Sequence, residues 1–420
     1  MNYKEKIIEG LLSTKKYTLF FLFWLALGSL MGIIGGAVGA LFSKTLAMVT
    51  DLRSEHSYLI FFLPVSGIAI IAIYKLCRLS KAGTNAVFET VRDEKTVPQL
   101  LAPAVFAATA LTHLFGGSAG REGAALQIGG SLAAFFGKLF RINEKQLHIL
   151  TMCGMAALFS AVFGTPVGAC IFAIEVASVG RLYTAAMFPC IVASSSAYGT
   201  ALMLGITSER YNVGEIPEFG LNVMLLTVAI GVCSAVVGIL FCTAMHESHA
   251  LFKKLFKNQF LRVAVGGIIV VLLSLLVGNG DYNGSGAHII DGIFEGHSIV
   301  PYAFLLKILF TAITMGSGYK GGEIVPTLFI GATLGGTVAG LMGASVPLGA
   351  AIGMVSLFSA VTNCPITAAT LAFELFGGGG AVFYMTAITV SYLLSGNFSL
   401  YNGQKIVYSR LNDTKIKTKG

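Results

Sequence analysis

The longest uncharged stretch of the chain limits what the protein can fold into. From Ile324 to Phe373, fifty consecutive residues include no Asp, Glu, Lys or Arg. A helix needs only about 20 apolar residues to cross the hydrocarbon core of a bilayer. A run of this length must therefore cross more than once and turn back between crossings. The stretch predicts a polytopic membrane protein.

The composition of the whole chain supports this prediction. Of the 420 residues, 55% are hydrophobic and 11% are charged, whereas a soluble domain carries about 25% charged residues. The first apolar stretch, which starts at residue 17, is far longer than the apolar core of a signal peptide. We therefore expect an all-α protein in a lipid bilayer, with this stretch retained as its first span.

Basic residues gather in three places on a chain of net charge +8: residues 1–16, 246–262 and 405–420. Lys and Arg collect in the cytoplasmic loops of membrane proteins. We therefore expect both termini to be cytoplasmic, in a multi-pass protein of the plasma (inner) membrane. Basic tails can also bind nucleic acid, but beside so much apolar chain no nucleic-acid partner is expected.

The two halves of the chain repeat each other. Residues 154–166 and 353–365 share Gly-Met, then Leu-Phe-Ser-Ala-Val, then Pro, at a constant offset, and the same offset carries Glu175 onto Glu374. Duplicated halves are typical of transporter folds, commonly with inverted topology and a binding site at the repeat interface. The predicted organisation is a tail at 1–16, a first membrane repeat at 17–210, a second repeat at 211–404 and a basic tail at 405–420.

Glycine-rich clusters interrupt both halves, at 116–123, 316–322 and 377–380. Irregular backbone at membrane depth is tolerated only where protein or a water-filled cavity shields it, so these clusters predict broken helices beside a buried site. Glycines also let membrane helices pack closely. The two interpretations are compatible.

The strongest local motif is Gly120–Gly129, which reads GREGAALQIG. A helix that begins inside this motif presents free N–H groups and the positive end of its dipole, which favours an anion. The carboxylate of Glu122 could occupy the anion's place when charged and leave it when protonated. The alternative is an ordinary Arg121–Glu122 ion pair at the surface.

This motif resembles the GREGP-x-x-Q-IG signature of the CLC chloride channel and transporter family, whose glutamate gates anion and proton passage. Ala124 replaces the usual proline. Thr165–Glu175 is similar to the family's next helix, Gly321–Pro326 (GGEIVP) stands where the family has GGIFAP, and Tyr401 matches a tyrosine near the central anion site. The resemblance implies the CLC fold, in which two inverted-topology repeats with broken helices meet at a central anion site. It also implies a homodimer without a cofactor.

Three departures from the family pattern point to one branch of it. Gly83–Val87 (GTNAV) replaces the GSGIP motif of chloride-transporting members, whose serine contacts the anion, and also lacks the proline of nitrate-preferring members. Glu323 stands where chloride-type members have an apolar residue. The inner proton-transfer glutamate of chloride/proton exchangers would fall at Val176. These changes resemble the fluoride/proton antiporter branch, which bacteria use to expel fluoride.

Fluoride is small and strongly hydrated, so a site that replaces its water must offer hydrogen-bond donors. Neutral Glu323 could also donate, because desolvation favours the uncharged form of a buried carboxylic acid, and ionisable residues inside a membrane are functional by default. We expect Glu122 to act as gate and proton carrier and Glu323 as a central acid that couples proton or fluoride movement. The expected anion-binding residues are Thr84, Asn85, Gly120, Arg121, Gly123, Ile324, Val325 and Tyr401.

The predicted function is therefore export of fluoride in exchange for protons, with fluoride and protons as the transported partners. A chloride or other halide transporter or channel of the same family is the alternative. An intramembrane enzyme is disfavoured, because no Ser/His, paired-Asp or HExxH arrangement lies in the expected spans.

Several other residues receive structural interpretations. The seven cysteines are scattered without a CxxC pair, and His246–His249 lacks metal-ligand spacing, so we expect neither a disulfide framework nor a metal site. Glu175 and Glu374 occupy equivalent repeat positions, which predicts a shared structural role such as capping a helix end. The sequence leaves open whether Phe88 lines the pathway.

Overall fold

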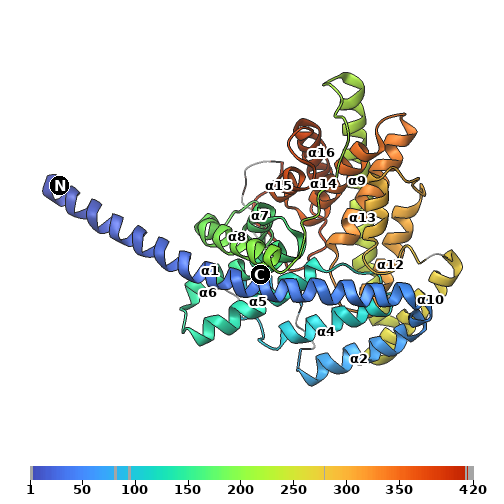
Figure 1. Ribbon diagram of the computed structural model, residues 1–420, viewed down its shortest axis with the longest axis horizontal. Helices are drawn as coiled ribbons and strands as arrows, with labels where there is room; N and C mark the ends of the chain where they lie inside the picture. Colours follow the sequence, from blue (N-terminus) through green and yellow to red (C-terminus); the bar gives the residue numbers. More distant parts are fainter. Residues whose placement is uncertain (1–2, 80–82, 93–95, 279, 412–413, 415–420) are drawn as a thin grey trace.

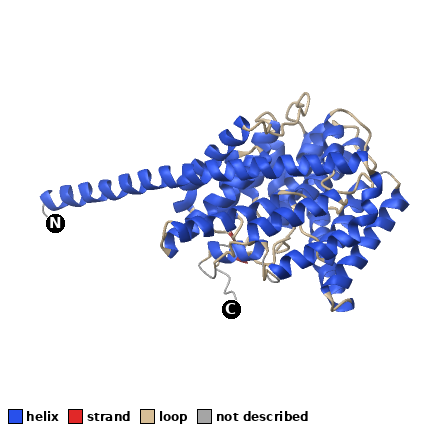
Figure 2. Ribbon diagram, turned by 60° about the horizontal axis from the view of Figure 1, so that its bottom comes forward, coloured by secondary structure: helices blue, strands red, loops and turns tan. Residues whose placement is uncertain are grey.

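The protein is described by a computed structural model that covers residues 3–79, 83–92, 96–278, 280–411 and 414, with side chains from Thr14 onward. Most of this chain is helical (Figure 2). Seven helical segments among these residues are long and apolar enough to cross a membrane, by length and composition. The all-α, polytopic prediction is confirmed. Figure 1 shows the N-terminal end of the first helix projecting away from the body of the molecule.

The described helices form two successive sets of eight. The first set is α1 (Tyr3–Glu55), α2 (Leu63–Leu76), α3 (Thr84–Val91), α4 (Leu101–Leu114), α5 (Glu122–Leu139), α6 (Glu144–Phe163), α7 (Pro166–Glu175) and α8 (Met187–Met203). The second is α9 (Leu221–Leu255), α10 (Gln259–Val277), α11 (Ala287–Phe294), α12 (Ala303–Ser317), α13 (Ile324–Leu341), α14 (Val346–Thr362), α15 (Pro365–Phe376) and α16 (Ala381–Leu394). Shorter elements are η1 (Ser57–Phe62), η2 (Thr184–Ala186), β1 (Ser178–Val179) and β2 (Lys405–Ile406).

The repeated sequence segments form the same helix boundary in both halves, between α6 and α7 and between α14 and α15. Gly164, where φ is 75°, caps the C-terminal end of α6, and Asn363, where φ is 60°, caps that of α14. Gly and Asn adopt this left-handed conformation at the lowest cost. In both halves a proline then occupies the first turn of the next helix, where its missing N–H costs nothing. The same sharp break therefore separates α6 from α7 and α14 from α15.

Four glycines let neighbouring helices approach to backbone contact. Gly129 of α5 meets Gly154 of α6, and Gly331 of α13 meets Gly353 of α14. A Cβ on any of the four would collide with a carbonyl oxygen of the opposing helix. These four glycines lie outside the three glycine-rich clusters, and they allow the close packing of membrane helices that small residues permit.

Two acids, the buried Glu175 and the half-buried Glu374, join the halves by capping each other's helices. The Glu175 carboxylate at the end of α7 accepts hydrogen bonds from the N–H groups of Ile366 (3.1 Å) and Thr367 (2.8 Å) at the start of α15. The Glu374 carboxylate in α15 accepts hydrogen bonds from Val167 N (2.9 Å) and Gly168 N (2.7 Å) at the start of α7. Each carboxylate supplies acceptors for N–H groups that the helix itself leaves free. The predicted shared structural role is confirmed.

The basic segments contain regular secondary structure. Helix α9 continues through most of residues 246–262, and only residues 256–258 separate it from α10. The C-terminal segment begins with β2, which pairs in parallel with β1 through Ser178–Lys405 and Val179–Ile406. Farther on, the Arg410 guanidinium donates to the Tyr392 carbonyl and the Asn363 side chain. Residues 405–410 are thereby attached to both halves.

Candidate functional site

The starts of two helices, one from each half, meet at a short backbone bridge. Gly120, just before α5, and Gly322, just before α13, form an antiparallel bridge: Gly120 N donates to Gly322 O (2.6 Å), and Gly322 N donates to Gly120 O (2.8 Å). A Cβ on Gly123 would lie 2.9 Å from Gly322 Cα, so only glycine allows this approach. Two helix N-termini with free N–H groups make this a place that favours negative charge.

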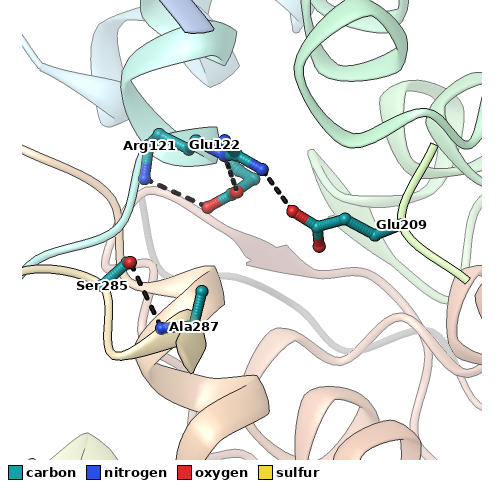
Figure 3. Close-up of polar contacts among 5 residues, drawn as sticks. All are labelled: Arg121, Glu122, Glu209, Ser285 and Ala287. Carbon is teal, nitrogen blue, oxygen red and sulfur yellow. Dashed lines mark hydrogen bonds and ion pairs between the residues drawn. The ribbon is translucent and has the colours of Figure 1, made fainter. Parts of the chain in front are cut away.

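Glu122 lies at the start of α5 with a fully buried side chain. Its Oε2 accepts a hydrogen bond from the backbone N–H of Arg121 (3.1 Å), and its Oε1 lies 3.4 Å from Arg121 Nε (Figure 3). The carboxylate therefore rests against backbone N–H at a helix start, where an anion would also be favoured. The predicted start of this helix is confirmed, and the alternative of a surface ion pair is wrong for Glu122.

Glu323 immediately precedes α13 and comes from the other half. Its backbone carbonyl accepts a hydrogen bond from Thr327 N (3.0 Å). Its side-chain Oε2 is buried and has no hydrogen-bond partner in the described structure. A Cβ on Gly123 would lie 3.2 Å from this oxygen. The two predicted acids thus sit at opposed helix starts, and Glu323 points toward the beginning of α5.

A cavity of about 370 Å³, which we call the tyrosine cavity, brings together four of the predicted residues: Thr84, Asn85, Glu323 and Tyr401. The Tyr401 hydroxyl is buried and has no partner among the described residues. The Thr84 hydroxyl accepts a hydrogen bond from Gln127 Nε2 (3.0 Å), which leaves its own hydrogen free to donate to a ligand. The Asn85 amide oxygen accepts from Gly403 N (2.9 Å), so its NH₂ is the end that can donate to a ligand.

Phe88 packs against Tyr401, one of the residues that line this cavity. Its fully buried ring packs edge-on against Tyr401, with centroids 5.2 Å apart and an interplanar angle of 86°. Phe88 is not among the residues that line the tyrosine cavity. Its contact with Tyr401 is therefore one of packing, which positions the tyrosine ring.

Sequence reasoning missed most of the polar lining of the tyrosine cavity. Basic and amide side chains contribute to the wall, namely Lys75, Gln127, His246, His249, Gln259, Arg262 and Lys320. Gln127 stands in the quoted motif, and its position four residues after Gly123 could have indicated its bond to the Gly123 carbonyl (3.3 Å). Lys320 directly precedes Gly321–Pro326, and its Nζ lies 4.7 Å from the Tyr74 ring centroid. The remaining side chains, namely Lys75, His246, His249, Gln259 and Arg262, lie outside these motifs, and only the packing of the helices brings them to the cavity.

A second cavity of about 110 Å³, which we call the arginine cavity, holds two other predicted residues. Arg121 and Val325 line it, together with His113, Glu209 and Ser285 among others. The guanidinium of Arg121 forms an ion pair with Glu209, which belongs to the loop between α8 and α9 (Figure 3). Ser285 Oγ accepts a hydrogen bond from Ala287 N (3.4 Å) at the start of α11. Neither Glu209 nor Ser285 belongs to a motif, so their position beside this cavity could not be predicted from the sequence.

The predicted anion-binding residues therefore divide into three groups. Thr84, Asn85 and Tyr401 line the tyrosine cavity, and Arg121 and Val325 line the arginine cavity. Gly120, Gly123 and the fully buried Ile324 lie in the wall between the cavities. Glu122 lines neither cavity, and we assign it to this wall because its two sequence neighbours reach both sides: Arg121 lines the arginine cavity, and a Cβ on Gly123 would lie 3.2 Å from Glu323 Oε2 of the tyrosine cavity. Within the described residues, no three His, Cys, Asp or Glu side chains gather as metal ligands would.

Comparisons with known proteins agree with this architecture. A family model described as voltage gated chloride channel matches residues 68–396. The chloride/fluoride channel protein of Pseudomonas syringae pv. tomato is 34% identical over 394 residues, covering 92% of this chain and 87% of that protein. The crystal structure of a CLC-type fluoride/proton antiporter matches with a TM-score of 0.89 and 34% identity, over 91% of this chain and 98% of that one. A slow cyanobacterial Cl⁻/H⁺ antiporter, 20% identical, shares the fold with a TM-score of 0.78, over 89% of this chain and 94% of that one.

Proposed function

The chain belongs to the voltage gated chloride channel (CLC) family, and on that premise we propose that it is an antiporter that exports fluoride in exchange for protons. The similarity to a CLC-type fluoride/proton antiporter extends over nearly the whole chain and supports this choice within the family. The observation that carries the proposal is Glu323, a carboxylate with an unpartnered oxygen at the junction of the two halves.

Glu122 acts as the gate and as the proton carrier in this proposal. When charged, its carboxylate holds the place of an anion at the start of α5 and closes the wall between the cavities. When protonated, it loses its charge and most of its attraction to Arg121 and to the helix start, so the side chain can leave. Fluoride then passes through the vacated position, and the proton moves with the gate.

Glu323 couples the two movements. Its free oxygen faces the start of α5, on the same cavity as Tyr401. As a neutral acid it donates a hydrogen bond to fluoride or to the gate, and as a carboxylate it accepts the proton. Val176 is buried and apolar where chloride/proton exchangers of the family would carry a glutamate, so a proton needs another acceptor.

The donors for a dehydrated fluoride ion come from the tyrosine cavity. The Tyr401 and Thr84 hydroxyls and the Asn85 amide each offer a hydrogen, and Gly120, Gly123, Arg121, Ile324 and Val325 contribute backbone at the two helix starts. Fluoride is smaller than chloride and a stronger hydrogen-bond acceptor, so it makes shorter hydrogen bonds to these donors. Short hydrogen bonds to a charged acceptor are the strong ones, and fluoride therefore gains more than chloride does. We assign selectivity for fluoride to this set.

The sidedness follows from charge. The tyrosine cavity is lined by His246, His249 and Arg262, from the basic stretch that the positive-inside tendency assigns to the cytoplasm. The arginine cavity then faces the outside, and both termini, residues 1–16 and 405–420, are cytoplasmic. The membrane repeats at 17–210 and 211–404 each supply one acid, and two copies of the chain form a homodimer in the plasma membrane.

One experiment separates this function from the alternative of a chloride or other halide transporter or channel. Purified protein is reconstituted in liposomes loaded with fluoride or chloride, and the liposomes are diluted into buffer without that anion. Anion efflux and internal pH are then recorded together. We expect fluoride efflux much faster than chloride efflux, with proton movement in the opposite direction. Glu122→Gln should abolish the proton movement. Equal halide rates, or fluoride efflux without proton movement in the wild type, would favour the alternative.

A further inference from the structure

Arg121 holds two carboxylates that reach it from different parts of the fold. Its Nε lies 3.4 Å from Glu122 Oε1, and its Nη2 pairs with Glu209 (Figure 3). Glu122 is fully buried, whereas the side chains of Arg121 and Glu209 are 26% and 31% exposed. One partner of the guanidinium is thus the proposed gate, and the other is an acid at the edge of the arginine cavity.

The loop that carries Glu209 is anchored on both sides of that residue. Before it, the Ser208 hydroxyl donates to the Tyr198 hydroxyl in α8 (2.9 Å). After it, Tyr211 N donates to Leu375 O in α15 (2.9 Å), and the Tyr211 ring stacks on Phe294 with centroids 4.6 Å apart. Isolated surface ion pairs contribute little because both side chains must be ordered. Here the backbone is already held, so less conformational freedom is lost when the pair forms.

The other charged or titratable groups around this place belong to several further elements. His113 of α4 lines the arginine cavity, as does Tyr211, and the Arg53 guanidinium of α1 donates to the His113 carbonyl (3.2 Å). Asp291 of α11 lies close enough to interact with Tyr211 and Glu209, and the ammonium group of Lys307 in α12 is buried and donates to Tyr282 O and Gly284 O. Glu323 lies beyond Gly123, on the tyrosine cavity. Among the described residues, the acids that form ion pairs with Arg121 are Glu122 and Glu209.

We propose that Glu209 is a positioning residue that sets the external pH at which the gate takes up its proton, by sharing the Arg121 guanidinium with Glu122. The inference rests on the proposed proton role of Glu122. With Glu209 charged, the attraction of Arg121 is divided between two carboxylates. Without that charge, Arg121 acts on Glu122 alone and stabilises the charged gate. The gate then takes up a proton only at a lower external pH.

The test uses the natural orientation of the protein in cells. Bacteria without fluoride export of their own express the full chain, are loaded with fluoride and are diluted into buffers of different pH while efflux is followed with a fluoride electrode. For Glu209→Gln we expect the pH of half-maximal efflux to fall by about half a unit or more. At the lowest external pH, its rate should return to that of the wild type. Glu218→Gln, an exposed acid in the same loop, is the matched control and should leave the profile unchanged.

Conservative and failed outcomes are also informative. Glu209→Asp keeps the charge at a shorter reach, so its half-maximal pH should lie between the wild type and Glu209→Gln. If Glu209→Gln does not accumulate in the membrane, the position of Glu209→Asp decides. A rate that falls equally at every pH, or a profile that does not move in either variant, overturns the inference in favour of a structural role. If wild-type efflux carries no protons at all in liposomes, the proposed function fails instead.

Discussion

Glu323 places a carboxylate oxygen in a buried position where no described residue donates a hydrogen bond to it. Burying such a group without a partner is costly unless a proton or a ligand completes it. The structure therefore holds an acid that needs a visiting group, beside the start of α5. This is a property of one residue, and it can be changed alone.

Glu323→Ala should reduce fluoride/proton exchange at least tenfold, equivalent to about 1.4 kcal/mol on the limiting barrier. Glu323→Gln should keep part of the fluoride binding, because an amide can still donate, but lose the exchange. Both are measured as fluoride and proton flux in liposomes, after size-exclusion chromatography has shown folded protein. Near-normal exchange by folded Glu323→Ala would remove the residue from the mechanism. Glu295→Gln, an exposed acid, serves as the control.

Tyr401 offers a second single-residue test, because its hydroxyl is unpartnered while its ring packs on Phe88. Tyr401→Phe deletes only the hydroxyl, so the free energy of unfolding should stay nearly unchanged. Fluoride binding, measured by isothermal titration calorimetry, should weaken about tenfold, as expected for a hydrogen bond to a charged group. Tyr401→Ala should also lower the thermal stability, because it leaves a cavity beside Phe88. An unaltered Kd in Tyr401→Phe would show that the hydroxyl does not reach the ion.

At the scale of helices, the short α7 and α15 depend on each other. Each helix carries, in its last turn, a glutamate that caps the start of the other helix, so neither cap exists before the two halves have come together. Within either half, the helix start would keep free N–H groups in an apolar setting. The exchange of caps therefore stabilises the association of the repeats.

Glu175→Gln and Glu374→Gln should each lower the thermal midpoint of the protein in detergent. A neutral amide offers one acceptor where the carboxylate offers two, and it loses the attraction to the helix dipole, a cost of about 1–2 kcal/mol per cap. Differential scanning fluorimetry measures the shift. Glu247→Gln, an exposed acid in α9, should leave the midpoint where it is. Equal midpoints for all three variants would contradict a stabilising role for the caps.

At the scale of the whole molecule, each chain contains a complete pair of acids and both cavities. If two chains associate as proposed, each should transport on its own. Mass photometry in detergent should give the mass of a dimer, and tandem dimers that combine a wild-type subunit with a Glu122→Gln subunit should keep about half of the proton movement, since one of two independent subunits remains. A stable monomer with full transport would contradict the assembly, and complete loss of proton movement in the tandem dimer would contradict independent pathways.

Much of the architecture could be predicted because its causes are local or periodic. Long uncharged runs predict a protein in a bilayer. The repeated Leu-Phe-Ser-Ala-Val segments predict that α6 and α14 are equivalent, and the glycine motif predicts the helix that begins at Glu122. The sequence predicts only a shared structural role for Glu175 and Glu374. Their equivalent positions are visible in the repeat, but the backbone N–H groups that each carboxylate caps are not.

The sequence by itself determined that this is a duplicated, membrane-spanning helical protein with two isolated acids in glycine-rich breaks. These features depend on residue type and spacing along the chain. Only the tertiary structure decided which side of the wall each candidate lines, that Gln127 orients Thr84, and that Glu209 reaches Arg121 from a loop 88 residues away. Such contacts join residues that are distant in sequence, and their positions are set by how the two halves pack rather than by any local preference of the chain.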